Sequence, residues 1–229
     1  MHIPDGFLTL VLCAVMYAIT ILFLIIAFWR TNRILSEKQI PLMATLTAMF
    51  FTAQMMNYPI IGGTTAHLLG GPILAITLGP YAGLISMTII LLIQALFFGD
   101  GGVLTFGANV FNMGVVGTFI PFLVLFAFLK VKPNRNSLLI GGFLGAFLGD
   151  LGAAVAAGLE LGLSYPTFPY GVSIALTAMV IHHSIIGIIE GVATLVILLT
   201  LHKARPDLLS LKRVAPIITG DLPPLMEGK

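Results

Sequence analysis

Long apolar segments separated by short polar turns occupy almost the whole chain. A helix needs roughly 20 apolar residues to cross the hydrocarbon core of a bilayer. Seven segments approach or exceed this length, at residues 8–29, 41–57, 67–79, 81–98, 107–129, 137–159 and 171–200. The third is short and ends at Gly79-Pro80, a helix-ending pair, so six or seven spans fit the pattern. It predicts an all-α membrane protein, a bundle of about seven transmembrane helices.

The composition agrees with this class of protein. Hydrophobic residues make up 58% of the chain, charged residues make up 9%, and the mean hydropathy is +1.07. Soluble domains are usually about a quarter charged. The single cysteine, Cys13, lies in an apolar segment, where it is interpreted as a small buried apolar residue.

The basic residues orient the predicted bundle. If the N-terminus lies outside and the chain crosses seven times, all 11 Lys and Arg residues fall on the cytoplasmic side, as the positive-inside rule requires. Arg30 and Arg33 follow the first span rather than precede it, so we expect a retained helix and no cleaved signal peptide. This topology puts Met1, His2 and His67 on the outer face and the C-terminus in the cytoplasm.

The charged residues outside the spans divide into two groups. The predicted outer loops carry only acids, Asp5, Asp100 and Glu160, which attract cations. Residues 201–229 are polar and contain four prolines. We therefore expect a single transmembrane domain at residues 1–200, followed by a poorly ordered cytoplasmic tail at residues 201–229.

The first two residues can offer three nitrogens to one metal ion. The Met1 amine and the His2 backbone nitrogen close a five-membered chelate ring, and the His2 backbone nitrogen and Nδ1 close a six-membered ring beside it. A chain can begin Met-His by chance, but the topology brings His67 to the same face as a candidate fourth ligand. A square of nitrogens suits Ni(II) or Cu(II) rather than Zn(II), Mg(II) or Ca(II). Protons must leave the amine and the amide, so affinity should rise with pH.

Ionisable residues also lie inside the predicted spans, at Asp150, His182, His183 and Glu190. Such residues are unfavourable in hydrocarbon and usually face the bundle interior. Two interpretations compete: a second metal or proton site, and a buried polar network that ties helices together. The structural interpretation is favoured because these residues lie a few turns below the outer surface.

Smaller side chains mark contact positions. Asn57, Thr65 and Asn109 are predicted near the outer ends of spans. There they could form hydrogen bonds that orient the ligand rings, or cap helix ends. Ala44 and Ala48 lie four residues apart on the second span. Small residues at this spacing let another helix approach closely, although so short a pair is a weak signal.

Some motifs are absent from the sequence. It contains no G-x-x-x-x-G-K-[ST], so this chain is not expected to bind a nucleotide in the usual way. It contains no H-E-x-x-H, so a zinc protease is not indicated. We expect neither an enzyme nor a nucleic-acid partner.

Five stretches together resemble the CbiM/NikM family, the metal-binding S subunits of energy-coupling-factor (ECF) importers for nickel and cobalt. They are MHIPDGFL, PLMATLTAMFFTAQMMNYPI, TAHLLGGPILAITLGP, QALFFGDGGVLTFGANVFNMG and HHSIIGIIEGVAT. The resemblance runs from residue 1 to about residue 200. It implies that Met1, His2 and His67 bind the metal and that Ala44 and Ala48 contact a coupling subunit.

The resemblance also implies a transporter made of several subunits. The chain would capture Ni(II), or alternatively Co(II), at the outer face of a bacterial or archaeal cell (inner) membrane. It would deliver the metal inward with a transmembrane coupling (T) subunit and two cytoplasmic ATPases, with a small accessory membrane subunit as a further component. The donor set favours nickel over cobalt.

Other functions stay open at the level of sequence. A stand-alone proton-coupled nickel/cobalt permease would use Asp150, His183 and Glu190 as a relay. An intramembrane enzyme would need an open metal position and a substrate cleft. A vitamin-binding subunit would need an aromatic platform for a flat ligand, but the single tryptophan, Trp29, lies at the cytoplasmic end in the predicted topology.

Overall fold

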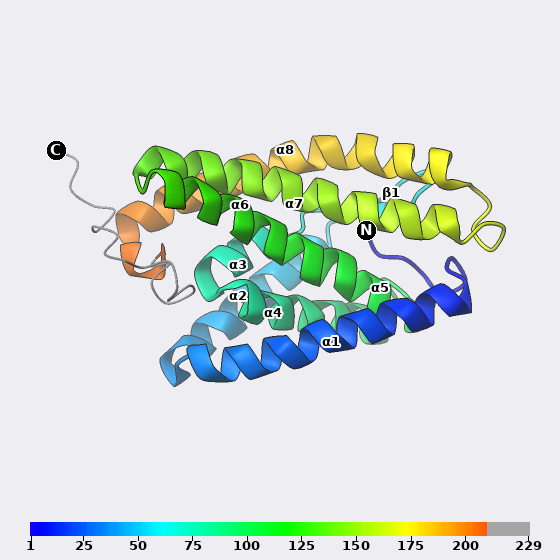
Figure 1. The fold of residues 1–229 in the computed structure, drawn as a ribbon, viewed down its shortest axis with the longest axis horizontal. Helices are drawn as coiled ribbons and strands as arrows, with labels where there is room; N and C mark the ends of the chain where they lie inside the picture. Colours follow the sequence, from blue (N-terminus) through cyan, green and yellow to red (C-terminus); the bar gives the residue numbers. More distant parts are fainter. Residues whose placement is uncertain (210–229) are drawn as a thin grey trace.

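The computed structural model describes residues 1–209, which form an elongated bundle of helices (Figure 1). The helices and strands are α1 (Leu10–Ile34), α2 (Ile40–Gln54), β1 (Tyr58–Pro59), β2 (Thr65–Ala66), α3 (Gly71–Leu78), α4 (Pro80–Ile93), α5 (Phe106–Asn109), α6 (Gly117–Val131), α7 (Arg135–Leu163) and α8 (Val172–Ala204). Two π-helical segments, η2 (Gln94–Phe98) and η3 (Val110–Val116), follow α4 and α5, and short 3₁₀ turns lie at η1 (Glu37–Gln39) and η4 (Pro206–Leu209). Most of the predicted tail, residues 210–229, lies outside the described residues.

Five helical stretches are long and apolar enough to cross a membrane. They are Leu10–Ile34, Pro80–Phe98, Phe106–Val131, Arg135–Leu163 and Val172–Ala204. The second predicted span corresponds to α2, which is apolar but shorter, with 15 residues. The prediction of an all-α, multi-pass membrane protein is confirmed.

The third predicted span, residues 67–79, is only partly helical, which its short length had left open. Only the eight residues of α3 are helical, and at 1.5 Å per residue they extend about 12 Å. All eight are buried, so α3 is a half-helix inside the bundle. Sequence could not distinguish the two cases, because an apolar segment buried in protein has the same composition as one buried in lipid.

A glycine sets the start of this half-helix. Gly70 caps α3 with φ +74°, a left-handed conformation that favours glycine. A Cβ at this position would also lie 2.1 Å from the ring of Phe50 on α2. The segment between His67 and α3 is therefore pressed against α2.

Glu160 is not in an outer loop, as predicted, but inside α7. The helix continues to Leu163, beyond the predicted end at residue 159. The Glu160 side chain is buried and accepts a hydrogen bond of 2.7 Å from Asn112 Nδ2. The amide of Asn112 on η3 thus satisfies the buried carboxyl group by a hydrogen bond. For this reason α7 can continue past Glu160 instead of ending before it.

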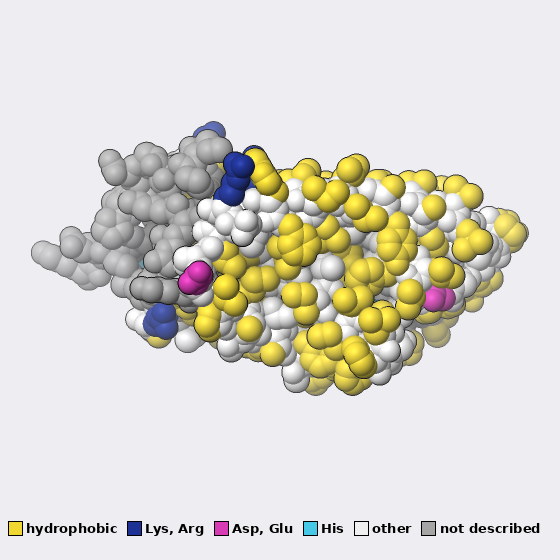
Figure 2. Space-filling view, turned by 90° about the horizontal axis from the view of Figure 1, so that it is seen from below, with side chains coloured by type: hydrophobic (Ala, Val, Ile, Leu, Met, Phe, Trp, Pro, Cys, Tyr) yellow, Lys and Arg dark blue, Asp and Glu magenta, His cyan; other side chains and the backbone are white. Residues whose placement is uncertain are grey.

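The outer surface of the bundle matches a lipid environment. Figure 2 shows one flank covered by apolar side chains, with the visible Lys and Arg side chains gathered near one end. Large apolar residues of α1 are also exposed, among them Leu10, Val11 and Leu22. The orientation of the two ends across the membrane stays a prediction.

Candidate metal site

The N-terminal segment before α1 runs back into the bundle, so that the chain begins inside it (Figure 1). Met1 and Ile3 are fully buried. The Ile3 N–H donates to Asn109 Oδ1 at 2.8 Å, and the Ile3 carbonyl accepts from Gly102 N at 2.9 Å and Thr105 Oγ1 at 2.5 Å. The segment is therefore held by the loop and first turn around α5.

Asp5 anchors the same segment at its outer end through hydrogen bonds. Its carboxylate accepts from three successive backbone N–H groups, those of Val103, Leu104 and Thr105, at 2.8–3.2 Å. A Cβ on Gly102 would lie 1.9 Å from Asp5 Oδ1, so this contact requires glycine at position 102. These hydrogen bonds fix how deeply the first residues enter the bundle.

Strand β2 holds the first two residues from the other side. The Met1 amine donates to Thr65 O at 2.5 Å and to Thr65 Oγ1 at 3.0 Å. The His2 N–H donates to the same hydroxyl at 3.1 Å, and Thr64 Oγ1 donates to His2 O at 2.6 Å. The amine and the first amide nitrogen are therefore fixed side by side.

The hydrogen bonds of the two histidine rings determine which ring nitrogens are bare. His2 Nε2 lies 2.9 Å from Gln94 Oε1, and His67 Nδ1 lies 2.9 Å from Leu68 O. Carbonyl oxygens only accept, so these two ring nitrogens are assigned as the protonated donors. His2 Nδ1 and His67 Nε2 are then unprotonated and carry free lone pairs.

These two bare nitrogens have no hydrogen-bond partner among the described residues although both are buried. Each residue is only 2% exposed, and the two rings lie with their centroids 4.6 Å apart. Buried polar atoms without a partner are rare and require an explanation. A cation bound between the rings would supply one, because Nδ1 of a histidine at position 2 is the atom that completes the chelate with Met1.

Burial keeps all of these donors neutral. Desolvation lowers the pKa of the Met1 amine to about 5 and that of the His2 ring to about 3. It also lowers the pKa of His67 well below its usual value, with the Met1 amine adding to the effect. At neutral pH the amine and both rings therefore have lone pairs ready for a metal.

One carboxylate approaches the donor set. Asp100 Oδ1 lies 3.4 Å from His2 Nδ1, and Asp100 Oδ2 accepts from Asn57 Nδ2 at 2.7 Å. Burial raises the pKa of the Asp100 carboxyl, while the Met1 amine and the Asn57 hydrogen bond act in the opposite direction. Among the described residues no three His, Cys, Asp or Glu side chains group as a metal site, so the candidate site depends on the backbone nitrogens.

Sequence reasoning missed Gln94. It lies on the π-helical segment after α4, is fully buried, and orients the His2 ring through Nε2. Such π-helical turns often occur at functional sites. A polar residue inside an apolar segment was the available signal, the same signal that pointed to Asp150 and Glu190.

The buried ionisable residues of α7 and α8 are brought together only in part. His183 Nδ1 lies 3.1 Å from Asp150 Oδ2, and the Glu190 carboxylate accepts from Leu69 N and Gly70 N at 2.8 Å each. His182 does not join them. Its ring is half-buried and its Nδ1 lies 2.8 Å from Ala178 O on its own helix.

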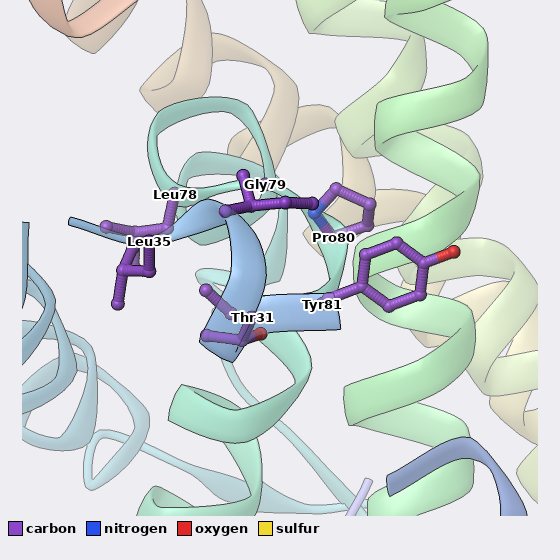
Figure 3. Close-up of a pocket in the computed structure, with 8 residues that line it drawn as sticks. Thr31, Leu35, Leu78, Gly79, Pro80 and Tyr81 are labelled. Carbon is purple, nitrogen blue, oxygen red and sulfur yellow. The ribbon is translucent and has the colours of Figure 1, made fainter. Parts of the chain in front are cut away.

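The small cavity of Figure 3 is a separate feature. Its volume is about 10 Å³, and it lies between the end of α1 and the Gly79-Pro80 corner that joins α3 to α4. Thr31, Leu35 and Tyr81 line it. A cavity of this size holds about one water at most, so it does not compete with the buried donor set as a site for a substrate.

The family model of the cobalt uptake substrate-specific transmembrane region (CbiM) matches residues 2–208. The chain belongs to the CbiM family. This CbiM-family chain is 38% identical over 227 residues to the fused nickel transport protein NikMN of Rhodobacter capsulatus, covering 93% of this chain and 65% of that protein.

Solved structures agree with this assignment. The crystal structure of a truncated transition metal transporter superposes with a TM-score of 0.84 and 41% identity, covering 89% of this chain and 99% of that one. The S component of a bacterial ECF transporter matches with a TM-score of 0.50 and 19% identity over 76% of this chain and 98% of that one. At that identity the second likeness concerns the fold alone.

Proposed function

We propose that this CbiM-family chain is the metal-binding S subunit of an ATP-driven ECF importer, and that its cargo is Ni(II), with Co(II) as the alternative. Met1 N, His2 N, His2 Nδ1 and His67 Nε2 are the four ligands. The observation that carries the proposal is the pair of buried, unpartnered ring nitrogens beside a buried amine that is neutral at pH 7.

The proposed ligands bind nickel through a defined change at Thr65. When the incoming metal displaces the proton of the His2 amide, the proton leaves to water and the nitrogen stops donating to Thr65 Oγ1. Thr65 Oγ1 still accepts from the Met1 amine at 3.0 Å, so the hydroxyl is not left unpaired. Gln94 and Leu68 O keep the two rings in the tautomers that expose the ligating nitrogens.

Nickel is preferred over cobalt in this proposal because of the donor type. The set consists of nitrogens only, one of them a deprotonated amide, and square-planar nitrogen sites suit Ni(II) and Cu(II). The family description names cobalt and the Rhodobacter relative is named for nickel, so both metals occur in the names of similar proteins. An equilibrium titration in which Co(II) binds ten times more tightly would overturn this preference.

The absence of a nucleotide-binding motif from the sequence and the fold of the chain both support a set of partner subunits. A transmembrane coupling subunit and two cytoplasmic ATPases would supply the energy, with a small accessory membrane subunit as a further component. The likeness in fold to an ECF S component supports this arrangement. The chain itself has no enzymatic activity. Residues 1–200 are the metal-capture domain and residues 201–229 a cytoplasmic tail, with the N-terminus outside a bacterial or archaeal cell membrane.

A groove between α2 and α4 is the proposed contact with the coupling subunit. Ala44 and Ala48 are exposed and line this groove, which has a volume of about 480 Å³. Apart from Thr47, the other lining residues are apolar, including Met43, Phe51 and Ile93. Small residues flanked by larger apolar ones let a partner helix pack closely within a membrane.

Nickel binding to a purified chain with a native N-terminus tests the proposal. The chain would carry its affinity tag at the C-terminus, and a matched variant would have one residue added before Met1. Calorimetry and visible absorption should show a planar, diamagnetic nickel complex in the native form and its loss in the extended form. Equal binding by both forms would mean that the metal lies elsewhere and would remove the terminal chelate.

A further inference from the structure

The carboxylate of Asp100 lies at the boundary between solvent and the buried donors. Its side chain is 15% exposed, whereas His2 is 2% exposed. Asn57, which donates to the other carboxylate oxygen, is exposed. Asn57, Asp100 and His2 therefore form a polar series that leads from the surface to the first ligating ring.

The turn that holds Asp100 also orients His2. The Asp100 N–H donates to Gln94 O at 3.1 Å across the π-helical segment, and the Gln94 side chain accepts from His2 Nε2. One short element therefore fixes the carboxylate and the ring relative to each other. The position of Asp100 is fixed by a backbone hydrogen bond to η2, the segment that it directly follows after Gly99.

The contact between Asp100 and His2 is not a hydrogen bond. His2 Nδ1 is bare because the other ring nitrogen carries the hydrogen, and the 3.4 Å separation from Asp100 Oδ1 does not meet hydrogen-bond geometry. Two electron-rich atoms thus face each other across a gap. A cation between them would convert an unfavourable arrangement into a favourable one.

We propose that Asp100 is the capture residue, the first group of this chain to contact the incoming divalent cation, which it passes to His2 Nδ1. The inference rests on the proposed metal-binding function. Asp100 Oδ1 replaces one water of the hydrated cation, and His2 Nδ1 then replaces another. Water is the leaving group in both exchanges, and no electron is transferred. In the final four-nitrogen complex Asp100 is not a ligand.

This role predicts an effect on the rate of binding more than on the final complex. A carboxylate beside the path raises the local concentration of a dication, and its loss should slow association on the order of tenfold. The four nitrogens are untouched, so the planar spectrum should stay the same. Dissociation retraces the same path and should slow by a similar factor, so the equilibrium affinity should change little, because the bound metal no longer contacts Asp100.

Stopped-flow measurement of nickel association with the purified chain, at low and high salt, tests the inference. Asp100→Asn removes the charge, Asp100→Glu keeps it, and Glu37→Gln removes the same charge from an exposed position at the other end of the bundle. Asp100→Asn should associate about tenfold more slowly, with a weaker dependence on salt. Asp100→Glu should restore most of the rate, and Glu37→Gln should match the unmodified chain.

Two results would overturn the capture role. An unchanged association rate in Asp100→Asn would show that metal arrives by another route. Loss of the planar spectrum in Asp100→Asn, with the association rate retained, would make Asp100 a structural residue or a ligand. Failure of the unmodified chain to form a planar nickel complex would instead refute the proposed function, so the two failures are distinguishable.

Discussion

Two groups of buried polar residues lie close together in this bundle, and their hydrogen bonding differs. In the first group, His2 Nδ1 and His67 Nε2 have no partner. In the second, both His183 ring nitrogens have oxygen neighbours, Asp150 and the Thr65 carbonyl, and Glu190 accepts from two backbone N–H groups. Residue types alone would favour the second group as a metal site, because it contains two carboxylates and a histidine.

The difference shows that available lone pairs, more than residue types, indicate a ligand site. The second group uses its hydrogen-bonding atoms to hold the first group in place. His183 Nε2 lies 3.4 Å from the carbonyl that also accepts from the Met1 amine, and Glu190 clamps the backbone just after His67. This favours the structural interpretation of Asp150, His183 and Glu190 over a proton relay.

The largest expected effect comes from removing a proposed ligand. His67→Ala deletes one of four nitrogens, so nickel affinity should fall by more than about a hundredfold, beyond the range usual for outer-shell changes. The fold should survive, because His67 Nε2 has no partner in the bundle and the one hydrogen bond lost, from Nδ1, goes to the adjacent Leu68 carbonyl. Calorimetry with nickel and a thermal unfolding scan would measure both. Retained nickel affinity in this variant would exclude His67 from the site.

A smaller effect concerns pH. Because the pKa of the Met1 amine is lowered to about 5 and that of the His2 ring to about 3, both groups are in their uncharged form at pH 6–8. Only the His2 amide then releases a proton on binding, and nickel affinity should rise about tenfold per pH unit between pH 6 and 8.

A short peptide that begins Met-His provides the control for this prediction. Its amine has an ordinary pKa of about 7.7–8.0, so below that value it should release about two protons per nickel. Below about pH 5 the amine of the folded chain should also begin to compete, and the slope should steepen. Release of two protons by the folded chain at pH 6–7 would contradict the buried, neutral amine.

The smallest effect on nickel is expected from the second group. His183→Ala leaves Asp150 without its ring partner, so the unfolding free energy should fall by about 1–3 kcal/mol while the planar nickel spectrum stays. His182→Ala is the matched control on the adjacent position, since its ring nitrogen Nδ1 pairs with Ala178 O on its own helix and its ring otherwise lies beside the exposed Tyr58. It should change stability by less than about 0.5 kcal/mol. A lost planar spectrum in His183→Ala, with stability unchanged, would make His183 a ligand.

Much of the fold was predictable, and the errors have a common cause. The length of the apolar segments identified the helices now seen as α1, α4, α7 and α8, because a helix that crosses lipid needs about 20 apolar residues. The same criterion overextended α3 and put Glu160 outside α7, because burial in protein permits short helices and paired acids. Gln94 was overlooked, and His182 was grouped with residues that it does not contact.

The sequence by itself determined the class of protein and the approximate helices, and it predicted a three-nitrogen chelate, since Met1 and His2 are covalently adjacent and need no fold to form one. Only the tertiary structure decided that the first residues turn back into the bundle, and that His67 lies 4.6 Å from His2, ring centroid to ring centroid. It also decided which ring nitrogens are bare and which carboxylate faces them. These are relations between segments far apart in the chain, and they depend on hydrogen bonds that form only when those segments pack.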